Sequence, residues 1–164
     1  MLVSSRASAI ASEPAKALPL GSTAVGCTME VAVNEFSEEQ WRSRLSRQAF
    51  EILRHKATER AFTGDYWDTW TAGTYHCAGC DTPLFRSTSK FDSGCGWPAF
   101  SEALRSDAVS TEVDRSHGME RTEVLCRSCG GHLGHVFSDG PPPLGTRYCI
   151  NSGALKLVAD PTSR

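Results

Sequence analysis

The sequence contains no run of 18 apolar residues, so no segment is long and apolar enough to cross a membrane as a helix. It also lacks a basic cluster: 17 lysine and arginine residues are scattered among 19 aspartate and glutamate residues, giving a net charge of −2 over 164 residues. Without a basic field, the chain is not expected to bind nucleic acid. No Gly-x-Gly-x-x-Gly fingerprint occurs, so a bound nicotinamide or flavin cofactor is not expected either.

Cysteine, by contrast, is plentiful, and four of the seven cysteines form two Cys-x-x-Cys pairs, Cys77 with Cys80 and Cys126 with Cys129. Each pair presents two thiolates from one tight turn, and two such turns complete the tetrahedral set that Zn²⁺ prefers. A catalytic zinc keeps an open position for water, whereas four thiolates leave none, so we predict a structural zinc site. Zinc deaminases also use Cys-x-x-Cys, but they need a His-x-Glu that occurs at none of the five histidines.

Two other interpretations of these pairs remain open, namely two structural disulfides or one redox-active dithiol. The odd number of cysteines and the lack of a secretory signal favour a reducing compartment, where structural disulfides are rare. We therefore expect the protein in the cytoplasm.

The first 34 residues differ in composition from the rest, because Ser, Ala and Val dominate and Arg6 and Lys16 are the only basic residues. We predict a flexible leader over residues 1–34 and one domain over residues 35–160. Ser-rich, acid-poor leaders are typical of transit peptides, so a mitochondrial or other organellar location is the alternative to the cytoplasm. Cys27 lies in this leader and is interpreted as incidental.

A helix is predicted from Ser37, because Ser37 and Gln40 have the spacing of a capping box and two glutamates occupy the first turn. Apolar residues then recur every three to four positions out to about Leu53, among them Trp41 and Ile52. The pattern indicates one helix with an apolar stripe that faces the core.

Four aromatic residues follow this helix: Phe62, Tyr66, Trp67 and Trp70. We interpret them as core or cover rather than as a binding surface, since a small domain needs bulky side chains to bury. Beyond Gly73, short apolar runs alternate with Gly, Pro, Asp and Ser, which indicates a β-rich layout.

Three further stretches resemble the motifs of one family, methionine sulfoxide reductase B: residues 91–100 (FDSGCGWPAF), 131–137 (GHLGHVF) and 147–152 (RYCINS). The two Cys-x-x-Cys pairs match its zinc-containing members, and the resemblance covers roughly residues 36–157. It implies a mainly β fold of antiparallel sheets with an N-terminal helical segment and a zinc site of four cysteines. Residues 55–57 depart from the usual family pattern, and we expect this departure to touch no catalytic residue.

The resemblance makes Cys149 the catalytic nucleophile. A thiol that reduces a sulfoxide attacks sulfur as a thiolate and must then be freed of the sulfenic acid that forms. Arg147 and Asn151 lie two positions to either side of Cys149, so all three share a face if the segment is extended, and such a polar face is a poor core face. Arg147 and nearby histidines are expected to lower the pKa of Cys149.

Cys95 matches the resolving cysteine of those family members that have one. By this resemblance it attacks the Cys149 sulfenic acid and leaves a Cys95–Cys149 disulfide, which thioredoxin then reduces. The alternative is that Cys95 is an inert turn residue and another reductant acts directly.

The resemblance also places His132 and His135 in the pocket beside the sulfoxide oxygen, where one of them donates the proton; the sequence leaves open which. Arg147 and Asn151 would bind this oxygen or a water molecule beside it. The indole of Trp97 would receive the methyl group of the substrate, with a buried structural ring as the alternative.

The implied function is thiol-dependent reduction of the R epimer of methionine sulfoxide in oxidised proteins, hence repair of oxidative damage. A monomer is the default expectation, since the sequence does not fix the oligomeric state. Whether free methionine sulfoxide also serves is left open. Two other classes compete. A zinc-ribbon module that binds protein or RNA has no use for Cys149, and a peroxide sensor would oxidise Cys95 and Cys149 without turning over a sulfoxide.

Overall fold

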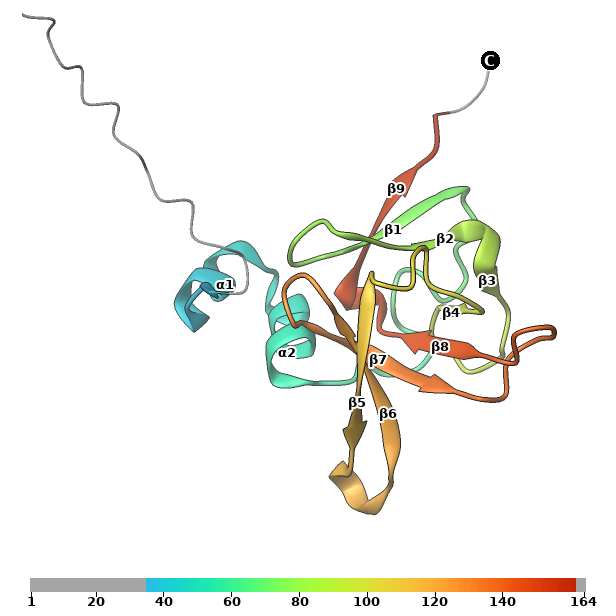
Figure 1. Ribbon diagram of the computed structural model, residues 1–164. Coiled ribbons are helices and arrows are strands. Elements are labelled where there is room, and N and C mark those ends of the chain that lie inside the picture. The colour runs from blue at the N-terminus through green and yellow to red at the C-terminus, as the bar shows by residue number, and fades with distance from the viewer. Residues whose placement is uncertain (1–34, 162–164) are drawn as a thin grey trace, which may run out of the picture. The chain divides into compact units, whose positions relative to one another are not determined.

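The computed structural model describes residues 35–161, and Figure 1 shows how their helices and strands are arranged. The predicted leader over residues 1–34, with Cys27, lies outside the described residues. Within the described range, no helix is long and apolar enough to cross a membrane.

Two antiparallel sheets form most of the regular secondary structure, which confirms the predicted mainly β fold. The smaller sheet has the strand order β2-β1-β9, and the larger has the order β3-β4-β8-β7-β6-β5. The strands are β1 Gly73–Cys77, β2 Pro83–Arg86, β3 Lys90–Phe91, β4 Ala99–Phe100, β5 Val109–Asp114, β6 Arg121–Cys126, β7 His132–Phe137, β8 Arg147–Ile150 and β9 Leu155–Ala159. The central strands β7 and β8 carry two of the predicted functional motifs.

The N-terminal helical segment consists of two helices, α1 (Glu38–Arg44) and α2 (Arg47–His55), where the sequence predicted one. The capping box at Ser37 is present as predicted. The chain leaves the helix at Leu45, whose backbone is extended, and the Ser46 hydroxyl accepts a hydrogen bond from a backbone N–H in the first turn of α2. A serine that caps a new helix competes with continuation of the old one, and the apolar period alone does not reveal this.

The predicted apolar stripe is buried. Trp41, Phe50, Ile52 and Leu53 are each 3% exposed or less. Helix α2 contacts β7 and the 3₁₀ turn η4, which spans Ser152–Ala154. Burial of such side chains contributes about 1.5–3 kcal/mol each, so α2 is held against the strand and the turn that border the functional motifs.

Aromatic rings join the two sheets. The Tyr75 and Phe100 ring centroids lie 5.0 Å apart, those of Phe85 and Phe100 4.5 Å apart, and those of Phe85 and Tyr148 5.6 Å apart. Because successive strand residues face opposite sides, Tyr148 in this cluster places the next residue, Cys149, on the other face of β8. Core packing therefore turns the predicted nucleophile away from the core.

Three of the four aromatic residues before β1 are not part of the core, which corrects the core part of the interpretation. Phe62, Trp67 and Trp70 are 56%, 38% and 52% exposed, and only Tyr66 packs against the core, next to Tyr75. The rings of the sheets already fill the interior, so this segment runs over the surface.

Candidate active site and metal centre

The pairing of β7 with β8 sets Cys149 directly opposite His135. Residues opposite each other in antiparallel strands share a face, with Cβ atoms about 4.5–5.5 Å apart. Gly134 makes this approach possible, because a Cβ at that position would lie 2.1 Å from the carbonyl oxygen of Cys149. The His-Leu-Gly-His motif therefore needs glycine at position 134, because any side chain there would collide with the backbone of β8.

Cys95 reaches the same site from the loop between β3 and β4, and its Sγ lies 3.6 Å from the Sγ of Cys149. The loop turns sharply at Gly94 and Gly96, which both have positive φ. The Ser93 hydroxyl donates a hydrogen bond to the Cys95 sulfur at 2.9 Å. A disulfide between these cysteines requires the sulfur atoms to close from 3.6 Å to about 2.05 Å.

The pKa values of Cys95 and Cys149 shift in opposite directions, whereas the sequence led us to expect a lowered pKa at Cys149. The hydrogen bond with Cys149, helped by Ser93 and by the Arg147 charge, lowers the pKa of Cys95 to about 5. The hydrogen bond with Cys95 and burial raise the pKa of Cys149, and they outweigh Arg147, which acts to lower it. The expected lowering of the Cys149 pKa is therefore wrong for the reduced pair, because the contact with Cys95 and burial raise this pKa.

A small cavity of about 120 Å³ opens beside Cys149. Its lining residues are Thr58, Trp97, Arg121, Gly134, His135, Phe137, Cys149 and Asn151. The indole of Trp97 is half-buried and its Nε1 donates to the carbonyl oxygen of Glu59 at 3.1 Å. Trp97 thus faces the cavity instead of being a buried structural ring.

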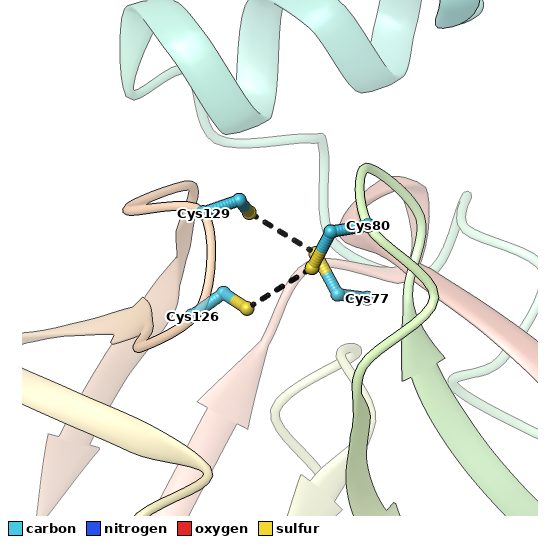
Figure 2. Close-up of side chains that lie close together, drawn as sticks. All are labelled: Cys77, Cys80, Cys126 and Cys129. Atoms are coloured by element: carbon cyan, nitrogen blue, oxygen red, sulfur yellow. Dashed lines mark hydrogen bonds between the residues drawn. The ribbon is translucent and has the colours of Figure 1, made fainter. Parts of the chain in front are cut away.

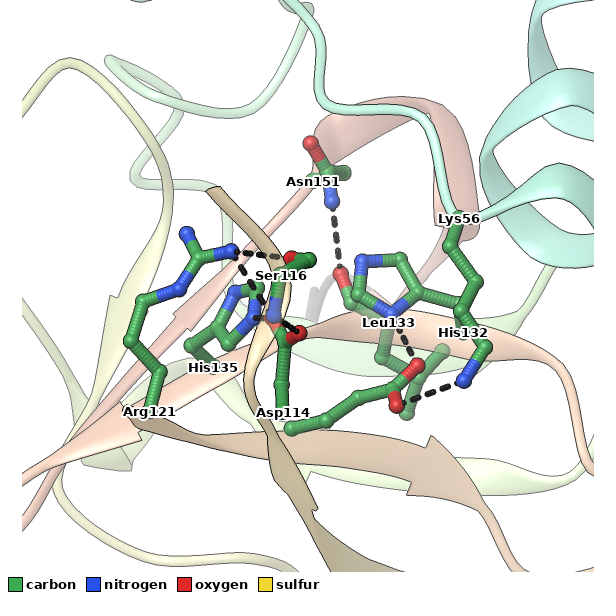
Figure 3. Close-up of polar contacts among 9 residues, drawn as sticks. Lys56, Asp114, Ser116, Arg121, His132, Leu133, His135 and Asn151 are labelled. Atoms are coloured by element: carbon green, nitrogen blue, oxygen red, sulfur yellow. Dashed lines mark hydrogen bonds and ion pairs between the residues drawn. The ribbon is translucent and has the colours of Figure 1, made fainter. Parts of the chain in front are cut away.

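The two histidines lie side by side, with ring centroids 5.5 Å apart, but in different surroundings (Figure 3). His135 lines the cavity, and its Nε2 lies 2.7 Å from Oδ2 of Asp114. Hydrogen bonds from Ser116 and from His135 hold the pKa of Asp114 well below its usual range. Arg121 forms an ion pair with the same carboxylate at 2.8 Å.

His132 is 2% exposed and does not line the cavity beside Cys149. Its Nδ1 lies 2.7 Å from Oε1 of Glu123, whose other oxygen accepts a hydrogen bond from Lys56 at 2.8 Å. Burial lowers the pKa of His132, although the Glu123 carboxylate acts to raise it. The neutral ring therefore donates from Nδ1 to Glu123, while its buried Nε2 has no hydrogen-bond partner in the described part of the chain.

Arg147 and Asn151 are largely engaged by neighbouring residues. The Arg147 guanidinium makes two hydrogen bonds to Asp139, at 2.8 and 2.9 Å, and lies 4.4 Å from the ring centroid of Phe137. The buried Asn151 donates from Nδ2 to the carbonyl oxygen of Leu133 at 3.0 Å (Figure 3) and accepts from a backbone N–H at residue 59 at 3.1 Å. One amide N–H of Asn151 is left for a substrate.

Glu59 is a buried residue of the site that the sequence did not indicate. Its two carboxylate oxygens accept hydrogen bonds from the backbone N–H groups of Ser152 and Gly153 at 2.6 and 3.0 Å. Its own backbone binds Asn151 and Trp97. Glu59 thus ties two predicted site residues to one another. All of these partners lie far away in the sequence, so no local pattern reveals the role.

Glu123 was missed for the same reason, and its contact with Lys56 adds a link to residues 55–57. Residues 55–57 were expected to touch no catalytic residue, and Lys56 lies outside the cavity at Cys149. Yet its ammonium group binds the carboxylate that orients His132. The departure at residues 55–57 therefore reaches the site through a single intervening side chain.

The four paired cysteines converge on one point between the two sheets (Figure 2). Their sulfur atoms lie within 4.8 Å of one another, with 3.7 Å between Cys77 and Cys129 and 3.6 Å between Cys80 and Cys126. Four thiolates about 2.3 Å from one ion in a tetrahedron are about 3.8 Å apart. The set therefore fits a metal ion, and the six cysteines of the described residues are all free thiols.

This centre joins distant parts of the chain. Cys77 ends β1 of the smaller sheet, Cys126 ends β6 of the larger sheet, and Arg54 of α2 donates to the backbone oxygen of Cys129 at 3.2 Å. An ion held here ties both sheets and α2 together at one point.

Comparisons with known proteins agree with this geometry. A family model described as SelR domain matches residues 45–159. The chain is 62% identical over 121 residues to "Peptide methionine sulfoxide reductase MsrB" of Bradyrhizobium diazoefficiens, covering 74% of this chain and 87% of the relative. The protein of the same name from Methylibium petroleiphilum is 59% identical over 119 residues, which cover 73% of this chain and 86% of that relative. The one from Thiobacillus denitrificans is 59% identical over 121 residues, which cover 74% of this chain and 92% of that relative.

Proposed function

The chain belongs to the SelR domain family and is a thiol-dependent peptide-methionine (R)-S-oxide reductase, and we propose that Cys149 and Cys95 carry its reaction. The observation that supports this assignment is the 3.6 Å contact between their sulfur atoms at the edge of a small cavity. In this proposal, the Cys149 thiolate attacks the sulfur of methionine sulfoxide. The oxygen atom passes to Cys149 as a sulfenic acid, and methionine leaves.

The proton balance follows from the pair of thiols. The contact between the two thiols raises the pKa of Cys149 and lowers the pKa of Cys95, so in this proposal a proton passes from Cys149 to Cys95 across the 3.6 Å contact before the attack. Cys95 then attacks the Cys149 sulfenic acid, and the proton of Cys95 passes to the departing hydroxyl group. The S–O bond breaks, water leaves, and a Cys95–Cys149 disulfide forms.

His135 is our candidate for the residue that protonates the departing oxygen. It lines the cavity beside Cys149, whereas His132 does not. Its Nε2 is engaged by Asp114, so Nδ1 is the ring nitrogen left for the substrate. A positioned general acid accelerates such a step about 10²–10⁴-fold. The free amide N–H of Asn151 binds the same oxygen, the Arg147 charge favours the thiolate at Cys149, and the Trp97 indole receives the methyl group, which selects the R epimer.

We assign one structural Zn²⁺ to Cys77, Cys80, Cys126 and Cys129. The sulfur distances support this assignment, and four thiolates leave no open position for a substrate. A bound zinc supplies folding free energy, about 10–16 kcal/mol in small peptides. These four residues orient the sheets, and they take no part in the sulfoxide chemistry.

The reductant in this proposal is thioredoxin, and the enzyme acts as a monomer in the cytoplasm on oxidised proteins. Reduction of the disulfide requires a dithiol from outside the chain. Six free thiols in the described residues fit a reducing compartment, where thioredoxin operates.

The test is thioredoxin-coupled consumption of NADPH with separated R and S epimers of a peptidyl methionine sulfoxide. We expect turnover of the R epimer alone. Cys149→Ser should abolish turnover, and Cys95→Ser should release about one equivalent of methionine and then stall. Oxidation of both cysteines by peroxide without turnover of either epimer would overturn the proposal in favour of a peroxide sensor.

A further inference from the structure

Phe62, Trp67 and Trp70 lie exposed on the surface and are called the aromatic patch below. Their side chains are 56%, 38% and 52% exposed. The rings of Phe62 and Trp67 meet edge to face, with centroids 5.3 Å apart, and the Lys90 ammonium lies 3.8 Å from the Trp70 ring centroid. Large apolar side chains gathered on a surface mark an interaction site more often than scattered ones do.

Phe62 holds an unusual backbone conformation. Its φ is +65°, in the left-handed region that a bulky residue rarely adopts. The Phe62 backbone N–H donates to the carbonyl oxygen of Gly96 at 2.8 Å, which keeps the segment in this conformation. An aromatic ring that is exposed and carried on a strained backbone contributes little to the stability of the fold. The presence of Phe62 here therefore points to a function at the surface.

The aromatic patch begins next to Cys95. A Cβ placed on Gly96, the residue after Cys95, would lie 2.8 Å from Cδ2 of Phe62, so the Phe62 ring packs directly on that glycine. Cys95 itself is partly exposed. A protein that docks on the Phe62 ring therefore lies against the loop that carries Cys95.

The hollows that can take the substrate do not include the aromatic patch. Phe137 and Arg121 line the cavity at Cys149, and the same two residues also line an adjoining groove of about 610 Å³ that runs toward Leu144. No member of the aromatic patch lines either hollow. A polypeptide attached to the sulfoxide has a path along this groove, and the aromatic patch remains free for a second protein.

We propose that the aromatic patch is the docking surface for the protein dithiol that reduces the Cys95–Cys149 disulfide; this proposal rests on the proposed function. The partner is a small protein of the thioredoxin class, with an apolar surface around its Cys-x-x-Cys. Its thiolate attacks Cys95, the Cys95–Cys149 bond breaks, and Cys149 leaves as a thiolate. The second thiol of the partner then attacks the sulfur of the partner's first cysteine in the mixed disulfide. This releases Cys95 as a thiolate and leaves the partner with an internal disulfide.

The test compares two reductants in the full-length, zinc-loaded enzyme. Phe62→Asn with Trp67→Gln removes both rings, and asparagine tolerates the left-handed backbone at position 62. We expect kcat/KM for thioredoxin to fall at least about tenfold, through a higher KM. Turnover driven by dithiothreitol, which needs no docking surface, and the KM for the R sulfoxide peptide should stay unchanged.

Val113→Thr is the matched control. Val113 is 59% exposed, and it lies on β5, at the opposite edge of the larger sheet from the strands that flank Cys95. The control should leave the KM for thioredoxin unchanged. If the double variant does not fold, each single variant and the conservative change Phe62→Tyr, expected to retain most of the affinity, carry the same test.

Two results would overturn the proposal. An unchanged KM for thioredoxin with a raised KM for the peptide would make the aromatic patch a substrate surface. Equal losses with both reductants would make its role structural. Failure of the proposed function is separate, because the wild-type enzyme would then reduce no R sulfoxide even with dithiothreitol.

Discussion

The sulfur atoms of Cys95 and Cys149 lie 3.6 Å apart, and this contact lowers the pKa of Cys95 and raises the pKa of Cys149. The loop that carries Cys95 joins β3 to β4, and Cys149 lies on β8, which pairs with β4. The same strand pairing that builds the sheet therefore brings the two thiols together.

The pKa of Cys149 should fall when Cys95 is replaced by serine. The hydrogen bond with Cys95 is the largest cause that raises this pKa, and Arg147, which lowers it, remains in the variant. The measurement is the rate of alkylation by iodoacetamide against pH, with the Cys149 peptide followed by mass spectrometry. Cys149 in the variant should become reactive at a lower pH than in the wild type. The same pH midpoint in both proteins would show that Cys95 does not set the ionisation of Cys149.

His135→Asn should slow sulfoxide reduction more than His132→Asn. His135 lines the cavity beside Cys149, and loss of a general acid costs about 10²–10⁴-fold in rate. His132 does not line this cavity, and its ring binds the buried Glu123 carboxylate instead. Single-turnover formation of methionine, without a reductant, isolates this step. A larger defect in the His132 variant would move the proton donor to that residue.

Glu123→Gln should lower the free energy of unfolding by about 1–3 kcal/mol at neutral pH, because it weakens two hydrogen bonds of a buried carboxylate. Burial acts to raise the pKa of Glu123, but the hydrogen bonds from Lys56 and His132 outweigh it, and the pKa is lowered from its ordinary value of 4.5. The stabilisation by this carboxylate is therefore present above pH 4.5 and is lost as the pH falls through the lower folded-state pKa.

Urea denaturation of both proteins across this pH range checks the prediction, with the exposed Glu102→Gln as the control. The gap between wild type and Glu123→Gln should narrow in acid, while Glu102→Gln should follow the wild type throughout. A gap that does not change with pH would mean that the Glu123 charge contributes nothing to stability.

Removal of zinc should unfold the protein. The four cysteines join both sheets and contact α2, and an ion held by them would contribute folding free energy comparable to the whole stability of a small domain. Thermal melts by circular dichroism with and without a strong chelator test this, together with the zinc content by atomic absorption. Cys77→Ser is the companion variant and should melt at a lower temperature than Cys149→Ser. A chelated protein with an unchanged cooperative melt would refute the structural role.

Several features were predictable because they depend on residues close together in the sequence. The capping box at Ser37 and the metal pairs need partners only two or three positions away, and backbone geometry then imposes their arrangement. The identity of Cys149 as the candidate nucleophile also follows from a short local motif. The break at Ser46 was missed, because a serine within an apolar period has no local mark that separates a cap from a surface position.

By itself, then, the sequence determined the fold class, the family and the four cysteines that cluster to fit a metal ion. Only the tertiary structure decided that the contact with Cys95 raises the pKa of Cys149, that Glu59 and Glu123 hold the site, and that Phe62 is exposed beside Cys95. The physical reason is distance along the chain. A pKa, a buried hydrogen bond and the exposure of a side chain all depend on neighbours that the folding of distant segments brings into contact.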